Sequence, residues 1–349
     1  MIKISVILII KDGEEYIRYL NEYFTNVEKK YESFYIFEYF IYENNSKDNT
    51  KKEIKKFYKN KKGLYWCENI DKNKDFSSLE GISNKRSEYM KELRNRLKNY
   101  HGELYSDFCL LLDCDVVLSN DLIPKMFNSF NEGLIYAGSS EYNIKEIDID
   151  NFIIDDIYSC KLFDDEKFFT YYEKNKCIIK RIDKYKSWDN ELYLKANLKN
   201  IVMVSVFDIC YQGYRHNKCK NHYYDSLAFV SKEGTNHGAD HNKNYTTCLF
   251  KNCIRCHNYR KKKFIYVNKK YLLDNYETIR VNSIFGGCSM IKTNIYNKVK
   301  WEGNYKCEHI GFCNSVRCHG FIILNPTIKV STTSPEYRDY KNIEKELLT

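Results

Sequence analysis

The sequence predicts an α/β protein with a mostly parallel central sheet, flanked by helices and interrupted by a Cys/His-rich insertion. Over residues 1–113, apolar β-branched runs alternate with amphipathic helical segments, a spacing typical of βαβ units. Polar clusters follow three of the expected strands, and parallel sheets bind their ligands at that edge. Between about residues 210 and 265, Cys, His and Asn become frequent, which indicates the insertion.

The first expected elements are a strand, a helix and a second strand. Residues 2–10 form a nearly continuous β-branched run, as in a strand buried on both faces. Lys11-Asp12-Gly13 ends that run, and a helix with one apolar face follows. A second apolar run at 34–42 ends in Glu43-Asn44-Asn45-Ser46. Ser46 or Asp48 can cap the next helix.

The next elements complete the alternation. A short third strand is expected at 64–67, a long helix over 82–100 and a fourth strand at 108–112. Asp113-Cys114-Asp115 ends this fourth strand. A helix over 120–130 is expected after it.

The pattern weakens in the second half of the chain. Residues 141–200 show no clear period. Regular structure is still expected in six places: strands at 134–137, 202–209, 284–288 and 321–324, and helices near 291–299 and 308–319. We therefore divide the chain into a half at 1–140, which contains the Asp113-Cys114-Asp115 motif, and a half at 141–349, which contains the insertion.

Composition narrows the function classes. The 349 residues carry a net charge of +9, but the lysines are spread along the whole chain, so no nucleic-acid partner is expected. No run approaches the ~18 apolar residues of a membrane span, and no targeting segment is visible. The expected location is therefore cytoplasmic, where the 14 cysteines are thiols or metal ligands rather than disulfides.

The insertion contains residues that can bind zinc. Cys219, His222, Cys253, Cys256 and His257 include enough thiols and imidazoles for one four-coordinate structural Zn²⁺ site. Unrelated reduced thiols are the other interpretation.

Asp113 and Asp115 form the sharpest signal for chemistry. Carboxylates two residues apart at the end of an extended segment point the same way. Their like charges are costly unless a cation lies beside them, and their oxygens suit Mn²⁺ or Mg²⁺ carrying substrate phosphates. A solvated turn before the next helix is the alternative interpretation.

Two further polar features precede this pair. The short side chains of Glu43-Asn44-Asn45-Ser46 can hydrogen-bond a nucleoside base and ribose, or can simply cap a helix through Asx turns. Arg94 lies on the long third helix, where it can pair with a phosphate through two hydrogen bonds or belong to a solvated basic face.

Taken in order, these motifs resemble the GT-A glycosyltransferases. The spacing from Leu93-Arg94-Asn95 to Leu112-Asp113-Cys114-Asp115-Val116 is similar to that of fungal mannosyltransferases, of both the Golgi mannan-polymerase type and the capsule α-1,3-mannosyltransferase type. The resemblance covers about residues 1–140 and 284–330. It implies a GT-A-like, Rossmann-like fold.

The resemblance also implies a function and a set of ligands. A sugar, by family a hexose, would pass from a UDP- or GDP-linked donor to a glycan or glycosylated acceptor. Asp113 and Asp115 would bind Mn²⁺ or Mg²⁺. The residues that would contact the nucleotide are Ile10, Lys11, Glu43, Asn45, Ser46 and Arg94.

The second half contributes further family motifs. Asp225 belongs to a Tyr-Tyr-Asp-Ser element like that of the capsule enzymes, and Gly286-Gly287 resembles the small-residue turn beside the donor sugar. Glu308 is the candidate catalytic acid/base, either as the base of an inverting reaction or as a group that orients hydroxyls in a retaining one. A helix N-terminal acid is its structural alternative. His309 replaces a second family acid, and its role stays open.

Two other functions remain as alternatives. A sugar nucleotidyltransferase would carry a glycine-rich basic loop for a triphosphate, and Lys11-Asp12-Gly13 is a poor match. A zinc-dependent nucleic-acid-binding protein would need a concentrated basic face.

Overall fold

A computed structural model of the whole chain gives the fold. The residues that it describes are 1–70, 84–131, 134–139, 146–148, 157–162, 168–173, 176–181, 192–198, 201–208, 230–231, 279–303 and 307–332.

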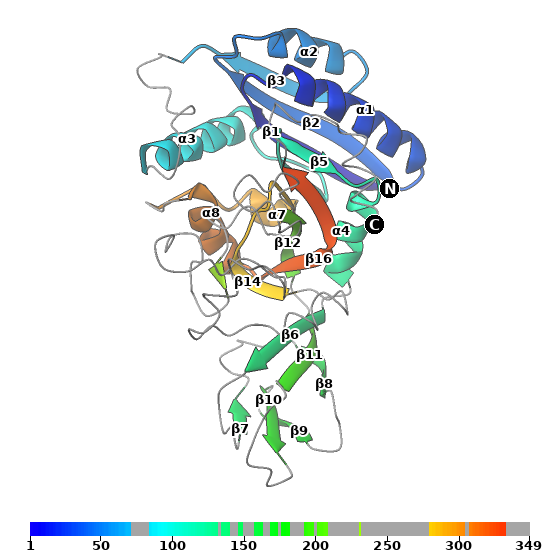
Figure 1. Ribbon diagram of the computed structural model, residues 1–349, viewed down its shortest axis with the longest axis vertical. Helices are drawn as coiled ribbons and strands as arrows, with labels where there is room; N and C mark the ends of the chain where they lie inside the picture. Colours follow the sequence, from blue (N-terminus) through cyan, green and yellow to red (C-terminus); the bar gives the residue numbers. More distant parts are fainter. Residues whose placement is uncertain are drawn as a thin grey trace, which may run out of the picture.

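Ten strands in the described residues form one central sheet, in the order β13-β14-β16-β12-β15-β4-β1-β2-β3, with β5 paired to β16. Figure 1 shows this sheet running through the main body of the molecule. The strands are β1 (Ile2–Ile10), β2 (Tyr35–Asn44), β3 (Gly63–Glu68), β4 (Phe108–Asp113), β5 (Val116–Leu118), β12 (Ile201–Asp208), β13 (Val230–Ser231), β14 (Ile279–Ser283), β15 (Cys288–Lys292) and β16 (Phe321–Thr332).

The N-terminal part of the sheet is parallel, as predicted. β1 pairs with both β2 and β4 in parallel, and β2 pairs in parallel with β3. β15 joins the sheet antiparallel to β4 and β12, whereas β12 and β16 run parallel. The predicted α/β fold with a largely parallel sheet is therefore confirmed, and strands from both halves of the chain build this one sheet.

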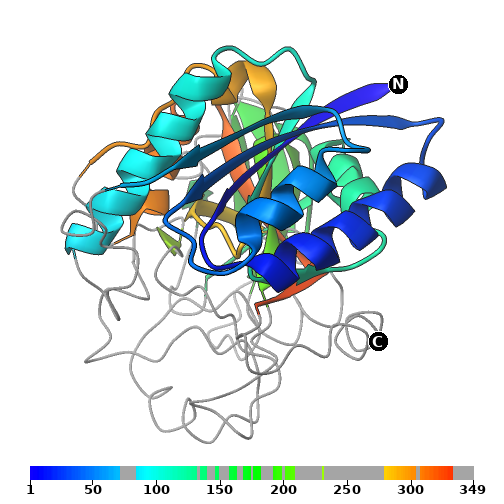
Figure 2. The same ribbon diagram turned by 90° about the horizontal axis from the view of Figure 1, so that it is seen from above.

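Helices cover both faces of the sheet. The helices in the described residues are α1 (Glu14–Lys30), α2 (Thr50–Phe57), α3 (Asn84–His101), α4 (Leu122–Asn131), α7 (Thr293–Tyr296) and α8 (Glu308–Arg317). One buried cluster joins the sheet to α1, α2 and α4. The other joins it to α3, α7 and α8. Figure 2 shows α3 on the opposite side of the sheet from α1 and α2.

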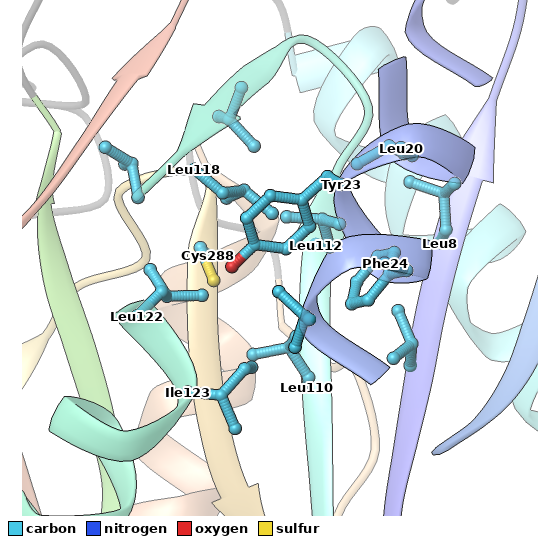
Figure 3. Close-up of a cluster of buried hydrophobic side chains, with 14 of the residues drawn as sticks. Leu8, Leu20, Tyr23, Phe24, Leu110, Leu112, Leu118, Leu122, Ile123 and Cys288 are labelled. Carbon is cyan, nitrogen blue, oxygen red and sulfur yellow. The ribbon is translucent and has the colours of Figure 1, made fainter. Parts of the chain in front are cut away.

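The sequence pattern explains how α1 packs. Leu20, Tyr23 and Phe24 recur at helical spacing and are all buried. Figure 3 shows them against Leu8 and Leu112 of the parallel strands. Burying side chains of this size contributes roughly 1.5–3 kcal/mol each.

Two smaller sheets lie at the end of the molecule away from α1 and α2 (Figure 1). One has the order β6-β11-β8 and the other the order β7-β10-β9. Their strands are β6 (Leu134–Ser139), β7 (Glu146–Asp148), β8 (Ile157–Leu162), β9 (Phe168–Glu173), β10 (Lys176–Arg181) and β11 (Leu192–Leu198). Apart from the strand expected at 134–137, the sequence pattern did not predict them.

One stretch of the second half corrects the sequence prediction. Residues 284–287, expected within a strand, form a turn between β14 and β15. Gly286 and Gly287 both have positive φ angles, 64° and 71°, which glycine adopts at little cost. The helix expected near 291–299 is shortened to α7, because β15 continues to Lys292.

The insertion at about 210–265 lies outside the described residues, apart from the two residues of β13. None of the helices in the described part of the chain combines the length and apolar character that a bilayer crossing requires.

Candidate functional site

The sheet register brings three predicted polar clusters to one edge. Ile10 of β1 lies opposite Glu43 of β2, and Ile9 lies opposite Asp113 of β4. Because these strands are parallel, the loops that follow them share the same end of the sheet. The predicted nucleotide and metal residues are thus neighbours in space.

The first two loops at this edge are bound to each other. The Asp12 main-chain N–H donates to Ser46 Oγ at 3.0 Å, and Lys47 N–H donates to Asp12 Oδ1 at 2.6 Å. Gly13 N–H donates to Thr50 Oγ1 at 2.8 Å. These bonds fix the turn after β1, where Asp12 has a φ of 48°.

Asp48 adds a second tie between the same loops. Its carboxylate accepts hydrogen bonds from the main chain of Glu14 and Thr50, both at 3.0 Å. Burial alone raises the pKa of Asp48, but the hydrogen bonds to its carboxylate outweigh burial and lower the pKa below its ordinary value. The loop after β2 is therefore held in place by charge-assisted hydrogen bonds.

Glu43 and Asn45 are partly committed to holding this loop. Glu43 is fully buried, and its Oε1 accepts a hydrogen bond from Ser46 N–H at 2.7 Å. Lys51 Nζ lies 3.6 Å from its other oxygen. The Asn45 amide binds both main-chain groups of Ile70, at 3.0 and 2.7 Å. A nucleotide contact by the Asn45 side chain would compete with that pair of bonds.

The acidic pair lies at the end of β4, as predicted. The Asp113 side chain is 35% exposed, and its Oδ1 accepts a hydrogen bond from Arg94 Nη2 at 3.0 Å. Burial and the charge of Asp113 raise the pKa of Asp115 to about 7. The two carboxyl groups therefore resist ionising together, and a divalent cation beside them would favour the charged form of both.

The strand that follows the pair is pinned by α1. The Leu118 N–H donates to the Tyr19 hydroxyl at 2.8 Å, and the Tyr23 hydroxyl donates to the Ser119 carbonyl at 3.0 Å. Figure 3 shows Tyr23 reaching toward Leu118 and Cys288. Both tyrosines are buried, so the chain leaving Asp115 has a fixed path.

Arg94 joins the acidic pair to α8. Its Nε donates to Glu308 Oε1 at 3.4 Å, and its Nη2 lies 3.4 Å from His309 Nε2. Arg94 is buried. Burial lowers the pKa of Arg94, but the charges of Asp113 and Glu308 outweigh burial and raise it above its ordinary value. The guanidinium is therefore a fixed positive charge between two carboxylates.

The glycine turn also meets the acidic pair. Asp113 N–H donates to the Gly287 carbonyl at 2.8 Å. Beneath the turn, buried Ser205 donates to the Phe285 carbonyl at 2.6 Å and lies 2.8 Å from the hydroxyl of Ser289. This network fixes the turn from below.

His309 is enclosed by aromatic rings and is only 5% exposed. Its ring stacks on the Phe285 ring, with centroids 3.9 Å apart. The Trp301 ring lies edge-on to it, with centroids 5.3 Å apart and an interplanar angle of 72°. Burial, together with the charges of Arg94 and Arg86, lowers its pKa well below the ordinary value, so the ring is neutral near pH 7. Its Nδ1 has no hydrogen-bond partner among the described residues.

Two sets of donor atoms at this site have the chemistry to hold a metal. Asp113 and Asp115 offer hard carboxylate oxygens at a partly exposed position, which suits Mn²⁺ or Mg²⁺. Cys307, Glu308 and His309 also place possible ligand atoms within 4.8 Å of one another. The Arg94 guanidinium contacts Asp113 as well as Glu308 and His309, so its contacts do not separate the two sets. We favour the aspartates as ligands because Asp113 is partly exposed, whereas Glu308 and His309 are buried.

The described residues therefore unite Arg94, Asp113, Gly287, Glu308 and His309 around one centre. Asp225 and the five Cys and His residues considered for zinc lie outside the described residues. Sequence reasoning did not single out Phe285 or Trp301, although Trp301 is one of only three tryptophans and that rarity was an available signal.

The chain was also compared with known proteins. No protein-family model and no curated protein matches it. Among solved structures, it is similar to residues 1–349 of TarS from S. aureus, with a TM-score of 0.42 and 11% identity over 99% of this chain and 64% of that one. The same protein in complex with UDP-GlcNAc gives a TM-score of 0.40 and 12% identity, over 97% and 61% of the two chains.

A third similar structure is mannosyltransferase PcManGT from Pyrobaculum calidifontis in complex with GDP-Man and Mn²⁺. Its TM-score is 0.40 and its identity 8%, over 97% of this chain and 59% of that one. The chain spans less than two thirds of the length of each of these structures. Likenesses at these scores assign no function, so a functional proposal has to rest on the site itself.

Proposed function

We propose that this protein is a metal-dependent glycosyltransferase, which moves a hexose from a UDP- or GDP-linked donor to a glycan or glycosylated acceptor. One observation carries the proposal. The acidic pair at the end of β4, the buried Arg94 and the glycine turn converge at the edge where β1 and β2 also end. A parallel sheet binds nucleotides at that edge.

Asp113 and Asp115 are the proposed metal ligands. A bound Mn²⁺ or Mg²⁺ would supply charge neutralisation for the diphosphate that leaves when the sugar bond breaks. The raised pKa of Asp115, to about 7, supports this assignment, because crowded carboxylates gain most from a cation.

Arg94 is proposed to face the same diphosphate. Its charge is buried and fixed by Asp113 and Glu308, and a preorganised cation stabilises developing negative charge better than a mobile one does. We propose that the nucleoside lies over the ends of β1 and β2, against Ile10, Lys11, Glu43 and Ser46.

The acceptor side is proposed to lie near Glu308. Its carboxylate is at the start of α8 and beside Arg94, within the same cluster as the acidic pair. Glu308 would hold or accept the acceptor proton, and Gly286-Gly287 would leave room for the donor sugar. Asp225 and His309 remain proposed donor-sugar or acceptor contacts.

A donor-hydrolysis screen tests the proposal. Purified protein is incubated with UDP- and GDP-sugars, with and without Mn²⁺, beginning with UDP-N-acetylglucosamine and GDP-mannose, and the release of UDP or GDP is measured. We expect Mn²⁺-dependent hydrolysis of at least one donor, and its loss in Asp115→Asn. Equal release by Asp115→Asn, or neither hydrolysis nor Mn²⁺-dependent nucleotide binding for any donor, contradicts the proposal.

A further inference from the structure

Asn95, the residue next to Arg94, hydrogen-bonds to a segment of the chain that is distant in sequence. Asn95 Nδ2 donates to the Trp301 carbonyl at 2.8 Å, and the Trp301 N–H donates to Asn95 Oδ1 at 3.1 Å. One amide side chain therefore binds both main-chain groups of a residue 206 positions away. Two bonds of this kind fix the position and the orientation of the Trp301 main chain.

The Trp301 indole lies against the charged centre. The Arg94 guanidinium carbon is 4.7 Å from the Trp301 ring and 5.3 Å from the Phe285 ring. The indole also stacks on Phe312 of α8, with ring centroids 4.1 Å apart and an interplanar angle of 14°, and lies edge-on to the His309 ring. Trp301 is itself buried, so its ring cannot turn without displacing α8.

These contacts fix the position and orientation of the Arg94 guanidinium group. Hydrogen bonds to Asp113 and Glu308 act at the edge of the guanidinium, whereas the aromatic rings lie within cation–π distance of it. An arginine side chain has several rotatable bonds, and fixing it costs conformational entropy. Rings that are already held in place reduce the number of positions open to the guanidinium, so less ordering is left for the ligand to cause.

We propose that Asn95 is a positioning residue of this site: by holding the Trp301 main chain, it keeps the indole against Arg94 and so fixes the charge that faces Asp113 and Glu308. The link between Asn95 and ligand binding rests on the proposed function. The two hydrogen bonds between Asn95 and the Trp301 main chain, which we call the clamp, can be tested without assuming that function.

The first test is fluorine NMR on the full chain labelled with 5-fluorotryptophan. The three tryptophans give three resonances, and Trp301→Phe assigns the one that belongs to Trp301. Asn95→Ala should shift or broaden that resonance and increase its H₂O/D₂O solvent shift. The matched control, Asn99→Ala, lies on an exposed position one turn along α3 and should leave the resonance in place. An unchanged Trp301 resonance in Asn95→Ala overturns the proposal, whether or not the protein binds nucleotides.

The second test measures affinity for Mn²⁺ with UDP or GDP by calorimetry. The loss of the clamp should weaken binding by about 3–10-fold, the value of roughly one hydrogen bond, while Asn99→Ala stays at wild-type affinity. Trp301→Phe should weaken binding similarly. Because both changes act through one contact, the double variant should lie within about twofold of either single variant. Fully additive losses would show that Asn95 does not act through Trp301.

The two tests separate the two ideas. If the wild type binds no nucleotide, the proposed function fails, and the NMR result still decides the clamp. If the wild type binds nucleotide and Asn95→Ala binds it equally well, the positioning role fails and the proposed function stands.

Discussion

Arg94 and Asp113 form a hydrogen-bonded ion pair, with Arg94 Nη2 3.0 Å from Asp113 Oδ1. The arginine comes from the middle of α3 and the aspartate from the end of β4, so the pair ties a surface helix to the edge of the sheet. The same guanidinium also contacts Glu308 of α8. The Arg94 guanidinium thus pairs with carboxylates from two separate segments of the chain.

This arrangement predicts that Arg94→Met destabilises the protein. Removing the cation leaves Glu308 buried beside an unpaired Asp113, and the loss of one partner of a buried ion pair costs about 3–5 kcal/mol. Urea unfolding at pH 7 measures the change. Arg96→Met is the control, because Arg96 pairs with Glu92 and Glu68 at a side-chain exposure of 39% and should cost less than ~1 kcal/mol. Equal losses in the two variants would contradict the assignment.

A second prediction concerns Asp115→Asn. The change removes one ligand charge from the acidic pair while keeping the side-chain shape, so the fold should persist and Mn²⁺ affinity should fall at least about tenfold. Calorimetry or electron paramagnetic resonance with Mn²⁺ measures the affinity, and circular dichroism checks the fold. Wild-type Mn²⁺ affinity in this variant would mean that the metal binds elsewhere.

The glycine turn allows a prediction with a closely matched control. Gly287 and Gly102 have φ angles of 71° and 67°, so alanine at either position should cost about 1–2 kcal/mol of backbone strain. Only Gly287 has a carbonyl bonded to the Asp113 main chain, whereas a Cβ at Gly102 meets no atom within 4 Å. We expect both variants to melt at lower temperature, but only Gly287→Ala to lose Mn²⁺-dependent donor hydrolysis. Loss of activity in Gly102→Ala would show that lower stability alone explains the effect.

A fourth prediction concerns pH and His101. Burial and the charge of Lys98 lower the pKa of His101 to about 4, although a hydrogen bond to the Gly102 carbonyl partly opposes them. A histidine with a folded-state pKa below its unfolded value of about 6.5 takes up its proton more readily when unfolded. The contribution of His101 to stability should therefore be lost as the pH drops from about 6.5 to about 4, whereas the raised pKa of Asp115 acts in the opposite direction.

His101→Gln should flatten part of that slope. The His101 contribution is at most about 3.5 kcal/mol, since one pKa unit is worth about 1.4 kcal/mol, and buried His309 acts in the same direction. Unfolding free energies at several pH values measure it. Above pH 7 the difference between the variant and the wild type should be constant, and parallel curves throughout the acidic range would rule out His101 as a source.

The sequence was enough to predict that polar clusters follow β1, β2 and β4, but not how their side chains pair. Asp113 was singled out by its residue type at a strand end, and Arg94 and Glu308 by helix position and by the resemblance to GT-A enzymes. The contact between Arg94 and Glu308 depends on how α3 and α8 pack, and no periodicity specifies that packing. Asn95 and Trp301 lie 206 residues apart, so their bond could not be predicted from spacing. Likewise, Asn45 was expected to face a nucleotide, yet its amide binds Ile70.

The last prediction concerns Glu308→Gln, which tests mechanism as well as location. Glutamine retains an oxygen that can accept the hydrogen bond from Arg94 Nε, now 3.4 Å from Glu308 Oε1, so the fold should survive. It cannot take a proton from an acceptor hydroxyl, and a positioned base typically contributes about 10²–10⁴-fold. We expect nucleotide affinity to stay within a few-fold and glycosyl transfer to fall by that factor if the reaction inverts the anomeric centre. A much smaller loss would favour a retaining reaction, in which Glu308 only orients hydroxyl groups. Calorimetry beside a transfer assay separates these outcomes, and unchanged transfer would mean that Glu308 serves only to hold Arg94.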